Sequence, residues 1–288
     1  MNERRHHALI LKGGTVVDGT GASRFAADVC IEDERIAAVG ANLATRDADV
    51  QDVAGRIVAP GFIDVHTHDD QMLLAAPQML PKISQGVTTV VIGNCGISLA
   101  PLVHTDAPPP LNLLGGSDKY VYPTMAAYVA ALGAARPAVN VAALIGHSTL
   151  RVATMDDPYR PATPAEQSRM IELLREGMDA GATGLSSGVF YAPGAAADID
   201  ELALLARVAG DTGGVYTTHI RDESDKVLDS LDEAFATGRR GSVPVVVSHH
   251  KCAGPRNWGR TVQTLAHIDT ARRQQPIALD MYPYIAGS

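Results

Sequence analysis

The pattern of hydrophobic and polar residues changes near residue 59. Before that point, short β-branched runs are separated by turns such as Gly-Gly, Asp-Gly and Gly-Thr-Gly. After it, apolar runs alternate with amphipathic segments. Short apolar runs bounded by glycine turns are typical of hairpins. We therefore predict a small all-β domain over residues 1–58 and a second domain over residues 59–288.

Seven apolar runs in the second domain have the length and the β-branched content of buried strands. They are Phe62–Val65, Thr88–Ile92, Asn140–Ile145, Thr183–Leu185, Val215–Thr218, Val243–Val247 and Ile277–Met281. Strands that alternate with helices build βαβ units and a parallel sheet that is buried on both faces. The second domain is therefore predicted to have an α/β fold.

Several of the predicted helices carry their own boundary signals. The stretch Pro164–Ala180 follows Thr163 as N-cap, has an acidic first turn and stops at Gly181. Asp198–Gly210 and Ser224–Thr237 show the same amphipathic spacing. Each of these stretches lies between two predicted strands, as a crossover helix must.

The number of strand–helix units favours a (β/α)8 TIM-type barrel, of which about seven strands are present. An open seven-stranded sheet is the alternative, and the strand order, which the sequence does not give, distinguishes the two. The chain ends at Tyr284-Ile-Ala-Gly-Ser288, just past the seventh predicted strand. We therefore expect a barrel that is truncated at its C-terminal end.

The charge and cysteine content of the chain exclude some classes of partner and indicate a cellular compartment. The chain has 24 basic and 32 acidic residues, a formal net charge of -8, and this balance argues against nucleic acid or an anionic membrane as a partner. The three scattered cysteines suit a reducing cytoplasm better than a disulfide framework. We see neither a signal peptide nor an apolar stretch long enough for a membrane helix. The sequence thus predicts a cytoplasmic protein, and its charge does not exclude an anionic small molecule as substrate.

Histidines gather where the predicted strands end. Barrels and open parallel sheets place their active sites at this carboxyl edge. His66 and His68 follow the first strand and, two residues apart, project to the same side. Six of the ten histidines occupy such positions, namely His66, His68, His147, His219, His249 and His250. Imidazole is a common ligand of zinc, so the pattern predicts a metal site.

Each of these residues also has a simpler interpretation. Cys95 could pack as a small apolar side chain, and His219 could be a core histidine bonded to a carbonyl. Only one of His249 and His250 can face inward on a strand, and we favour a pocket-wall position for His147. Jointly, however, one cysteine and two histidines from three strands match a catalytic zinc with one open coordination position.

Several motifs resemble one enzyme family. Ala59-Pro-Gly-Phe-Ile-Asp-Val-His-Thr-His-Asp69 resembles the first-strand signature of the amidohydrolase superfamily. Gly13-Gly-Thr-Val-Val-Asp-Gly-Thr-Gly21 is similar to the small β-sandwich domain of these enzymes. Three further motifs resemble the N-acyl-D-amino-acid deacylase (D-aminoacylase) group: Gly93-Asn-Cys-Gly96, Thr218-His-Ile-Arg221 and Ser248-His-His-Lys251. The resemblance covers Leu9 to Ser288.

The resemblance implies a zinc ion held tightly by Cys95, His219 and His249, with His66 and His68 at a second, weaker metal position. Relatives of the hydantoinase type bridge two metals with a modified lysine on strand four. In this chain, strand four reads Ala-Thr-Gly-Leu-Ser-Ser and contains no lysine. The deacylase group is therefore the better match.

The same resemblance implies zinc-dependent hydrolysis of N-acyl-D-amino acids to a carboxylate and a D-amino acid. Lys251 would hold the substrate carboxylate, Tyr191 and Tyr282 would contact the substrate and polarise its amide, and Ser288 falls where the group has a substrate-contacting serine. The aspartate that activates water and protonates the leaving amine would lie on strand eight, beyond Ser288. We therefore expect no acid–base residue within the 288 residues.

Two other hypotheses remain open. The chain could be a non-catalytic fragment that binds metal, because the strand-eight aspartate is missing from it. It could also be an amidohydrolase that acts on another amide or on a cyclic imide. A panel of D- and L-acyl amino acids would separate these activities.

Overall fold

The computed structural model describes residues 8–44 and 48–286, with only the backbone of Ser117. The chain divides into two compact units, Met1–Phe62 and Ile63–Ser288. The boundary lies within the strand that follows Pro60-Gly61. Each unit is described by itself.

The first unit contains a five-stranded sheet. Its central strand β1 (Ala8–Val16) pairs antiparallel with β2 (Phe25–Glu32), which pairs antiparallel with β3 (Arg35–Gly40). On the other side, β1 pairs parallel with β4 (Ala48–Asp52) and β5 (Ile57–Val58). That this unit is a β-sandwich stays a prediction, since its described residues form one sheet.

A second sheet of seven strands organises the larger unit. In chain order the strands are β6 (Phe62–Asp64), β7 (Val87–Ile92), β10 (Asn140–Gly146), β11 (Gly184–Gly188), β12 (Val215–His219), β13 (Val245–Val247) and β14 (Ile277–Leu279). The spatial order is the same as the chain order, and the pairs from β7 to β14 are parallel. A doubly wound open sheet would reverse its order at a switch point. The sequential order therefore matches the predicted barrel.

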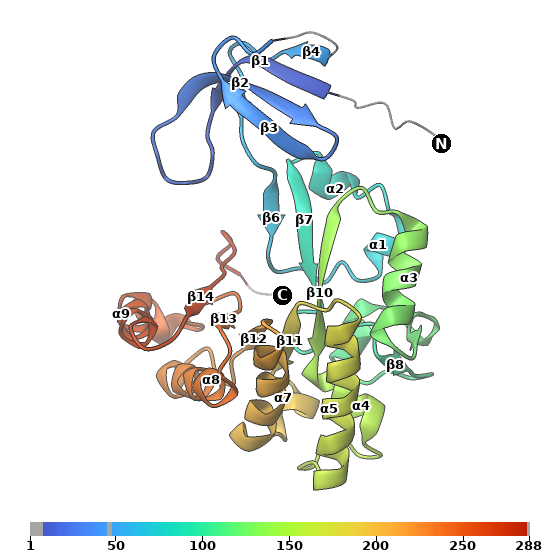
Figure 1. The fold of residues 1–288 in the computed structure, drawn as a ribbon. Helices are drawn as coiled ribbons and strands as arrows, with labels where there is room; N and C mark the ends of the chain where they lie inside the picture. Colours follow the sequence, from blue (N-terminus) through green and yellow to red (C-terminus); the bar gives the residue numbers. More distant parts are fainter. Residues whose placement is uncertain (1–7, 45–47, 287–288) are drawn as a thin grey trace. The chain divides into compact units, whose positions relative to one another are not determined.

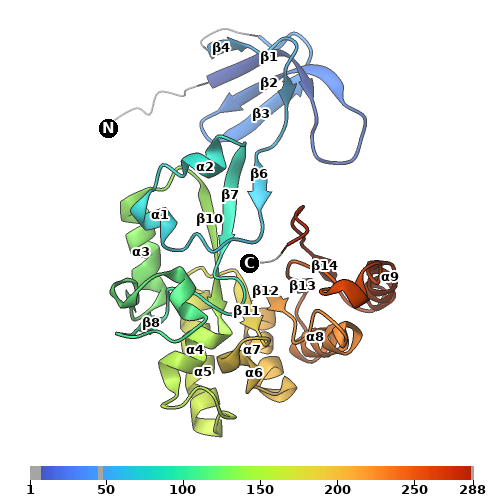
Figure 2. The same cartoon turned by 180° about the vertical axis from the view of Figure 1, so that it is seen from behind.

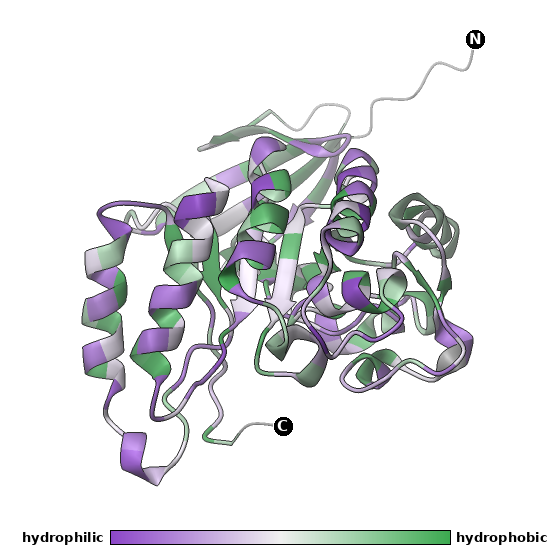
Figure 3. Ribbon diagram, turned by 90° about the horizontal axis from the view of Figure 1, so that it is seen from below, coloured by the Kyte–Doolittle hydropathy of each residue, from purple (hydrophilic) through white to green (hydrophobic). Residues whose placement is uncertain are grey.

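Crossover helices follow the curve of this sheet. They are α3 (Met125–Ala135), α5 (Pro164–Asp179), α7 (Ile199–Asp211), α8 (Val227–Gly241) and α9 (Thr261–Arg272). Consecutive members of this series pack side by side, in the order of the strands (Figure 1). In α5, α7 and α8, most of the buried residues are apolar. Hydrophobic and hydrophilic residues alternate along several of the helices (Figure 3). Among the described residues, no helix is long and apolar enough to span a membrane.

The predicted start of α5 is confirmed. The Thr163 side chain accepts from the Glu166 backbone N–H, and the Glu166 carboxylate accepts from the Thr163 backbone N–H. This capping box satisfies two backbone donors that the helix itself leaves unpaired. By contrast, α8 starts three residues later than predicted, because Asp222 binds the backbone N–H groups of Ser224 and Lys226 and holds them in a turn.

Shorter elements complete the unit. The helices α1 (Met72–Ala75) and α2 (Leu80–Ile83) link β6 to β7, and α4 (His147–Thr154) and α6 (Ala192–Ala195) follow β10 and β11. The stretch that follows Pro108-Pro109-Pro110 contains two 3-10 turns, Leu111–Leu114 and Ser117–Lys119. It is flanked by a small hairpin of β8 (Leu102–Val103) and β9 (Val121–Tyr122), and β8 lies beside α4 (Figure 2).

Candidate metal centre

Five of the predicted ligand side chains converge at the carboxyl ends of β6, β7, β12 and β13. They form two groups, and within each group the candidate ligand atoms all lie within 4.8 Å of one another. The inner group consists of Cys95, His219 and His249, and the outer group of His66, His68 and Cys95. Cys95 belongs to both groups, so one sulfur connects two potential metal positions.

A tight turn after β7 aims the Cys95 side chain. Gly93, Cys95 and Gly96 all have left-handed backbones, with φ values of 76°, 54° and 77°. A Cβ at Gly96 would lie 2.6 Å from the Gly188 backbone nitrogen, and a Cβ at Gly188 would lie 2.2 Å from the Cys95 carbonyl oxygen. Glycine is therefore required at both positions, because only glycine allows β11 to approach this turn so closely.

The inner group has the spacing that zinc requires. The Cys95 Sγ and His249 Nε2 atoms are 3.5 Å apart, and the rings of His219 and His249 have centroids 4.4 Å apart. In a tetrahedral site with bonds of about 2.3 Å to sulfur and about 2.1 Å to nitrogen, these two ligand atoms lie about 3.6 Å apart. One thiol and two imidazoles also form a donor set that suits zinc. The residues present therefore fit this ion.

His249 faces the centre and His250 does not. His249 has a φ of 36°, and its backbone N–H donates to Asp280 Oδ1 over 2.6 Å. His250 instead contacts the Thr264 hydroxyl on α9 through Nε2, at 2.8 Å. This confirms that only one of the two histidines faces inward, and it shows that the hydrogen bond to Asp280 supports a strained backbone at that one.

Glu223 lies at the centre of the charged contacts of the site. It follows β12, and its Oε1 atom is 2.9 Å from His249 Nδ1, while both of its oxygens are 2.7 Å from Lys251 Nζ. Burial disfavours its charge, but hydrogen bonds to His249 and Lys251 outweigh burial and lower its pKa to about 2. Glu223 is therefore ionised at neutral pH.

His219 and Cys95 are both buried. The His219 Nδ1 atom lies 3.3 Å from the Tyr191 hydroxyl, and Phe190 stacks on the ring with centroids 5.4 Å apart. Burial lowers the pKa of His219 to about 3, so its imidazole is neutral at pH 7. Burial, together with the charges of Asp280 and Glu223, raises the pKa of Cys95 to about 12. Without metal, Cys95 therefore carries its proton.

The outer group is held less firmly. His66 Nε2 lies 3.2 Å from Cys95 Sγ, and His66 Nδ1 lies 3.3 Å from Asp280 Oδ2. His68 is exposed, and its ring meets the His66 ring edge-on with centroids 5.7 Å apart. Among the described residues, no hydrogen bond fixes His68. One of the two histidines in this group therefore lacks an orienting partner.

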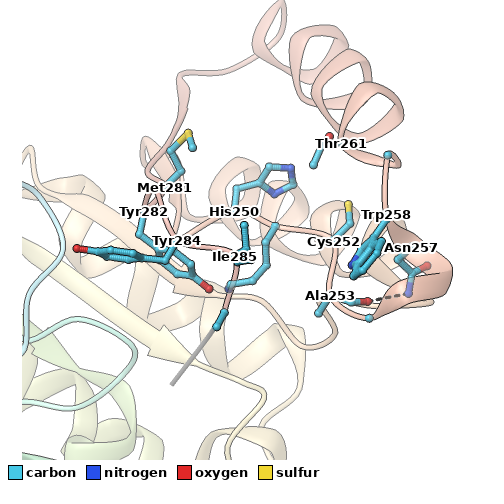
Figure 4. Close-up of a pocket in the computed structure, with 14 residues that line it drawn as sticks. His250, Cys252, Ala253, Asn257, Trp258, Thr261, Met281, Tyr282, Tyr284 and Ile285 are labelled. Atoms are coloured by element: carbon cyan, nitrogen blue, oxygen red, sulfur yellow. Dashed lines mark hydrogen bonds between the residues drawn. The ribbon is translucent and has the colours of Figure 1, made fainter.

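The predicted substrate residues lie on two sides of the inner group. Tyr191 is next to His219, as described above, and Lys251 Nζ lies 5.4 Å from the Tyr282 ring centroid. Lys251 and Tyr282 also line a cavity of about 640 Å³ (Figure 4). The rest of its wall includes His250, Cys252, Trp258, Met281 and Tyr284. Ser288 lies outside the described residues.

His147 belongs to neither ligand group. It is fully buried, and its Nε2 atom lies 2.8 Å from Glu201 Oε1. Arg151, also fully buried, donates to the same oxygen. Because His147 is fully buried and its hydrogen bond is to Glu201, we interpret it as a structural residue, and not as the pocket-wall residue that we expected.

Glu223 and Asp280 are not among the residues predicted from the sequence, although both contact candidate ligands. Glu223 lies four residues after His219 in the same strand-end segment, and Asp280 follows the last residue of β14. Carboxylates commonly accept the second ring N–H of a metal-binding histidine. A search for carboxylates at the strand ends, rather than for ligands alone, would have found both.

Comparisons with known proteins identify the family of the chain. Residues 49–275 match a family model described as the amidohydrolase family. The chain is 49% identical over 281 residues to a D-aminoacylase of Alcaligenes xylosoxydans xylosoxydans, covering 97% of this chain and 58% of that protein. It superimposes on a crystal structure of D-aminoacylase with a TM-score of 0.94 at 51% identity, covering 97% of this chain and 59% of the other.

A further solved structure contains zinc and an inhibitor. It is an N-acyl-D-glutamate deacylase from Bordetella bronchiseptica in complex with zinc and a phosphonate inhibitor that mimics the tetrahedral intermediate of the reaction. The TM-score is 0.91 at 48% identity, covering 96% of this chain and 58% of that one. The chain thus spans less than two thirds of the length of these relatives. The roles of the individual site residues in this chain stay predictions.

Proposed function

Because the chain belongs to the amidohydrolase family, we propose that it contributes the zinc centre of an enzyme that hydrolyses N-acyl-D-amino acids to a carboxylate and a D-amino acid. The main support is the convergence of Cys95, His219 and His249 from three strand ends at the spacing of a zinc site. Relatives that share about half of its residues are named as deacylases of this kind.

In this proposal, Cys95, His219 and His249 hold the principal ion, and His66 and His68 form a second, weaker position with the same sulfur. Zinc supplies a Lewis acid that polarises the acyl carbonyl and makes a water molecule more acidic. The protein contributes a buried, mostly preorganised set of ligands, so little rearrangement is needed on binding. This division of work is common to zinc hydrolases.

Lys251, which lines the cavity, would bind the substrate carboxylate as a point charge. Tyr282, which shares the cavity wall with Lys251, and Tyr191, which lies beside His219, would donate hydrogen bonds to the substrate. The carboxylates at the centre already have partners, since Glu223 binds Lys251 and His249. As the resemblance to the deacylase group implies, we place the general base and acid on an aspartate outside these 288 residues.

Two measurements test the proposal. Zinc content would be determined for the purified 288-residue chain, and hydrolysis of N-acetyl-D-leucine, N-acetyl-D-glutamate, their L-enantiomers and dihydrouracil would be followed for the complete gene product. We expect one firmly bound zinc and hydrolysis of D-substrates only. Activity that is unchanged in a metal-free protein would refute the metal-dependent mechanism. Preferred hydrolysis of dihydrouracil would identify a cyclic amide as the substrate.

A further inference from the structure

Glu223 and Lys251 contact the same nitrogen of His249. The Nδ1 atom of His249 lies 2.9 Å from Glu223 Oε1 and also 2.9 Å from Lys251 Nζ. The side chains of Glu223 and His249 are only 14% and 12% exposed, so water does not readily replace either contact. Two side chains of opposite charge therefore compete for one ring nitrogen.

The two contacts require different tautomers of the imidazole. An ionised carboxylate only accepts hydrogen bonds, so Glu223 requires a proton on Nδ1. A lysine ammonium only donates, so Lys251 requires a lone pair there. A neutral imidazole carries one proton, and the hydrogen bond made by one nitrogen fixes the state of the other. Only one of the two contacts can therefore be a hydrogen bond at a time.

The choice of tautomer decides whether His249 can bind metal. Its Nε2 atom faces Cys95 Sγ at 3.5 Å, on the side of the inner group. Binding through Nε2 needs a lone pair on that atom, which leaves the proton on Nδ1. Glu223 supports this tautomer, whereas donation from Lys251 to Nδ1 would place the proton on Nε2, where it would block the ligand position.

We propose that Glu223 is a positioning residue that selects the metal-binding tautomer of His249 and keeps Lys251 from donating to the same nitrogen. The inference rests on the zinc centre proposed above. The two contacts of 2.7 Å between Glu223 and Lys251 give the ammonium group a charged acceptor other than the ring nitrogen. Glu223 thereby couples the residue assigned to the substrate carboxylate to a residue assigned to the metal.

Another glutamate offers a matched control. Glu233 on α8 binds Arg221 through both oxygens, at 2.7 and 2.8 Å. It therefore resembles Glu223 in making two charge-assisted bonds to a cation, but its hydrogen bonds involve no histidine. A Glu233→Ala variant removes a comparable ion pair without changing the contacts of a candidate ligand.

The test measures zinc affinity on the 288-residue chain by competition with a chromogenic chelator. We expect Glu223→Ala to weaken zinc binding by about 10- to 100-fold, the usual effect of losing such a partner. In the double variant Glu223→Ala/Lys251→Met, most of the affinity should return, because the competing donor is gone. Lys251→Met and Glu233→Ala alone should leave it nearly unchanged. Circular dichroism and urea unfolding check that every variant folds.

The results of this test distinguish a failure of the proposed zinc centre from a failure of the tautomer selection. A wild-type chain that binds no zinc refutes the proposed centre and this inference with it. Wild-type affinity in Glu223→Ala refutes the inference alone. A loss of affinity that Lys251→Met does not relieve shows that Glu223 has only a structural role, and overturns the tautomer selection.

A second measurement needs no variant at Glu223. Imidazole ¹⁵N chemical shifts distinguish a protonated ring nitrogen from one with a lone pair. In the metal-free wild-type chain labelled at histidine, we expect the His249 signals to show a protonated Nδ1 and an unprotonated Nε2. The assignment comes from the signals that disappear in His249→Asn. A protonated Nε2 would overturn the proposal.

Discussion

The inner and outer ligand groups share Cys95 but differ in how their histidines are held. In the inner group, His219 lies against Tyr191 and Phe190, and His249 is bound through both its backbone and its ring. In the outer group, His66 contacts Asp280, while His68 is exposed. The same residue types can therefore form sites of different metal affinity. Hydrogen-bond partners hold a ligand side chain in place, so less conformational entropy is lost when the metal binds.

The largest effect should come from the shared ligand. Cys95→Ala removes the sulfur from both groups, so we expect zinc affinity at both positions to fall by more than ~100-fold, beyond the usual effect of losing a partner residue. Chelator competition on the purified chain measures this. If one zinc still binds with wild-type affinity in the variant, Cys95 is not a ligand.

A pair of matched variants separates the two groups. His219→Asn should abolish tight binding, with a loss of ~100-fold or more, while His68→Asn should leave the tight site within about threefold of wild type and weaken only a second equivalent of zinc. Cobalt titration, followed through the thiolate-to-cobalt absorption band, monitors both. Equal losses in the two variants would mean that the groups form a single site.

The pH dependence distinguishes the first ion from the second. Burial raises the pKa of Cys95 to about 12, so the thiol must release its proton when the first zinc binds. Burial lowers the pKa of His219 to about 3, so its ring is already neutral and releases no proton. Apparent affinity for the first zinc should therefore rise about tenfold per pH unit between pH 6 and pH 8. The second zinc should release fewer protons, since the shared thiolate has already formed.

Calorimetry in buffers of different ionisation enthalpy counts these protons directly. We expect about one proton released with the first zinc. A first binding event that is independent of pH would show that the sulfur is not a ligand, or that it is already a thiolate in the metal-free chain.

The smallest effect concerns the carboxylate that contacts both groups. In Asp280→Asn, the remaining oxygen can still accept from the His249 backbone N–H, while the new amide N–H₂ faces His66 Nδ1 and can only donate to it. We expect the second zinc to bind up to ~10-fold more weakly and the first to change little. A larger loss at the first site would show that Asp280 mainly supports the strained His249.

Some features of the fold and of the site could be predicted from the sequence, and others could not. The seven strands, the capped start of α5 and the convergence of five ligand candidates follow from local patterns: apolar runs, a Thr-x-x-Glu box and histidines placed after strands. Contacts between residues distant in the chain decide the orientation of His250 toward α9 and the roles of Glu223 and Asp280. A local side-chain turn decides the later start of α8. The strand order, which separates a barrel from an open sheet, is likewise a tertiary property.

The left-handed backbone conformations of Cys95 and His249 affect which substitutions are favourable at these two positions during evolution. An ordinary residue in this conformation costs on the order of 1 kcal/mol or more, which the surrounding hydrogen bonds and a bound metal ion would offset. A descendant that no longer bound metal would lose this offsetting interaction. Substitution of either residue by glycine or asparagine would then stabilise the fold. Continued presence of both ligands together with Gly96 and Gly188 would therefore record selection for metal binding, even in descendants whose substrate has changed.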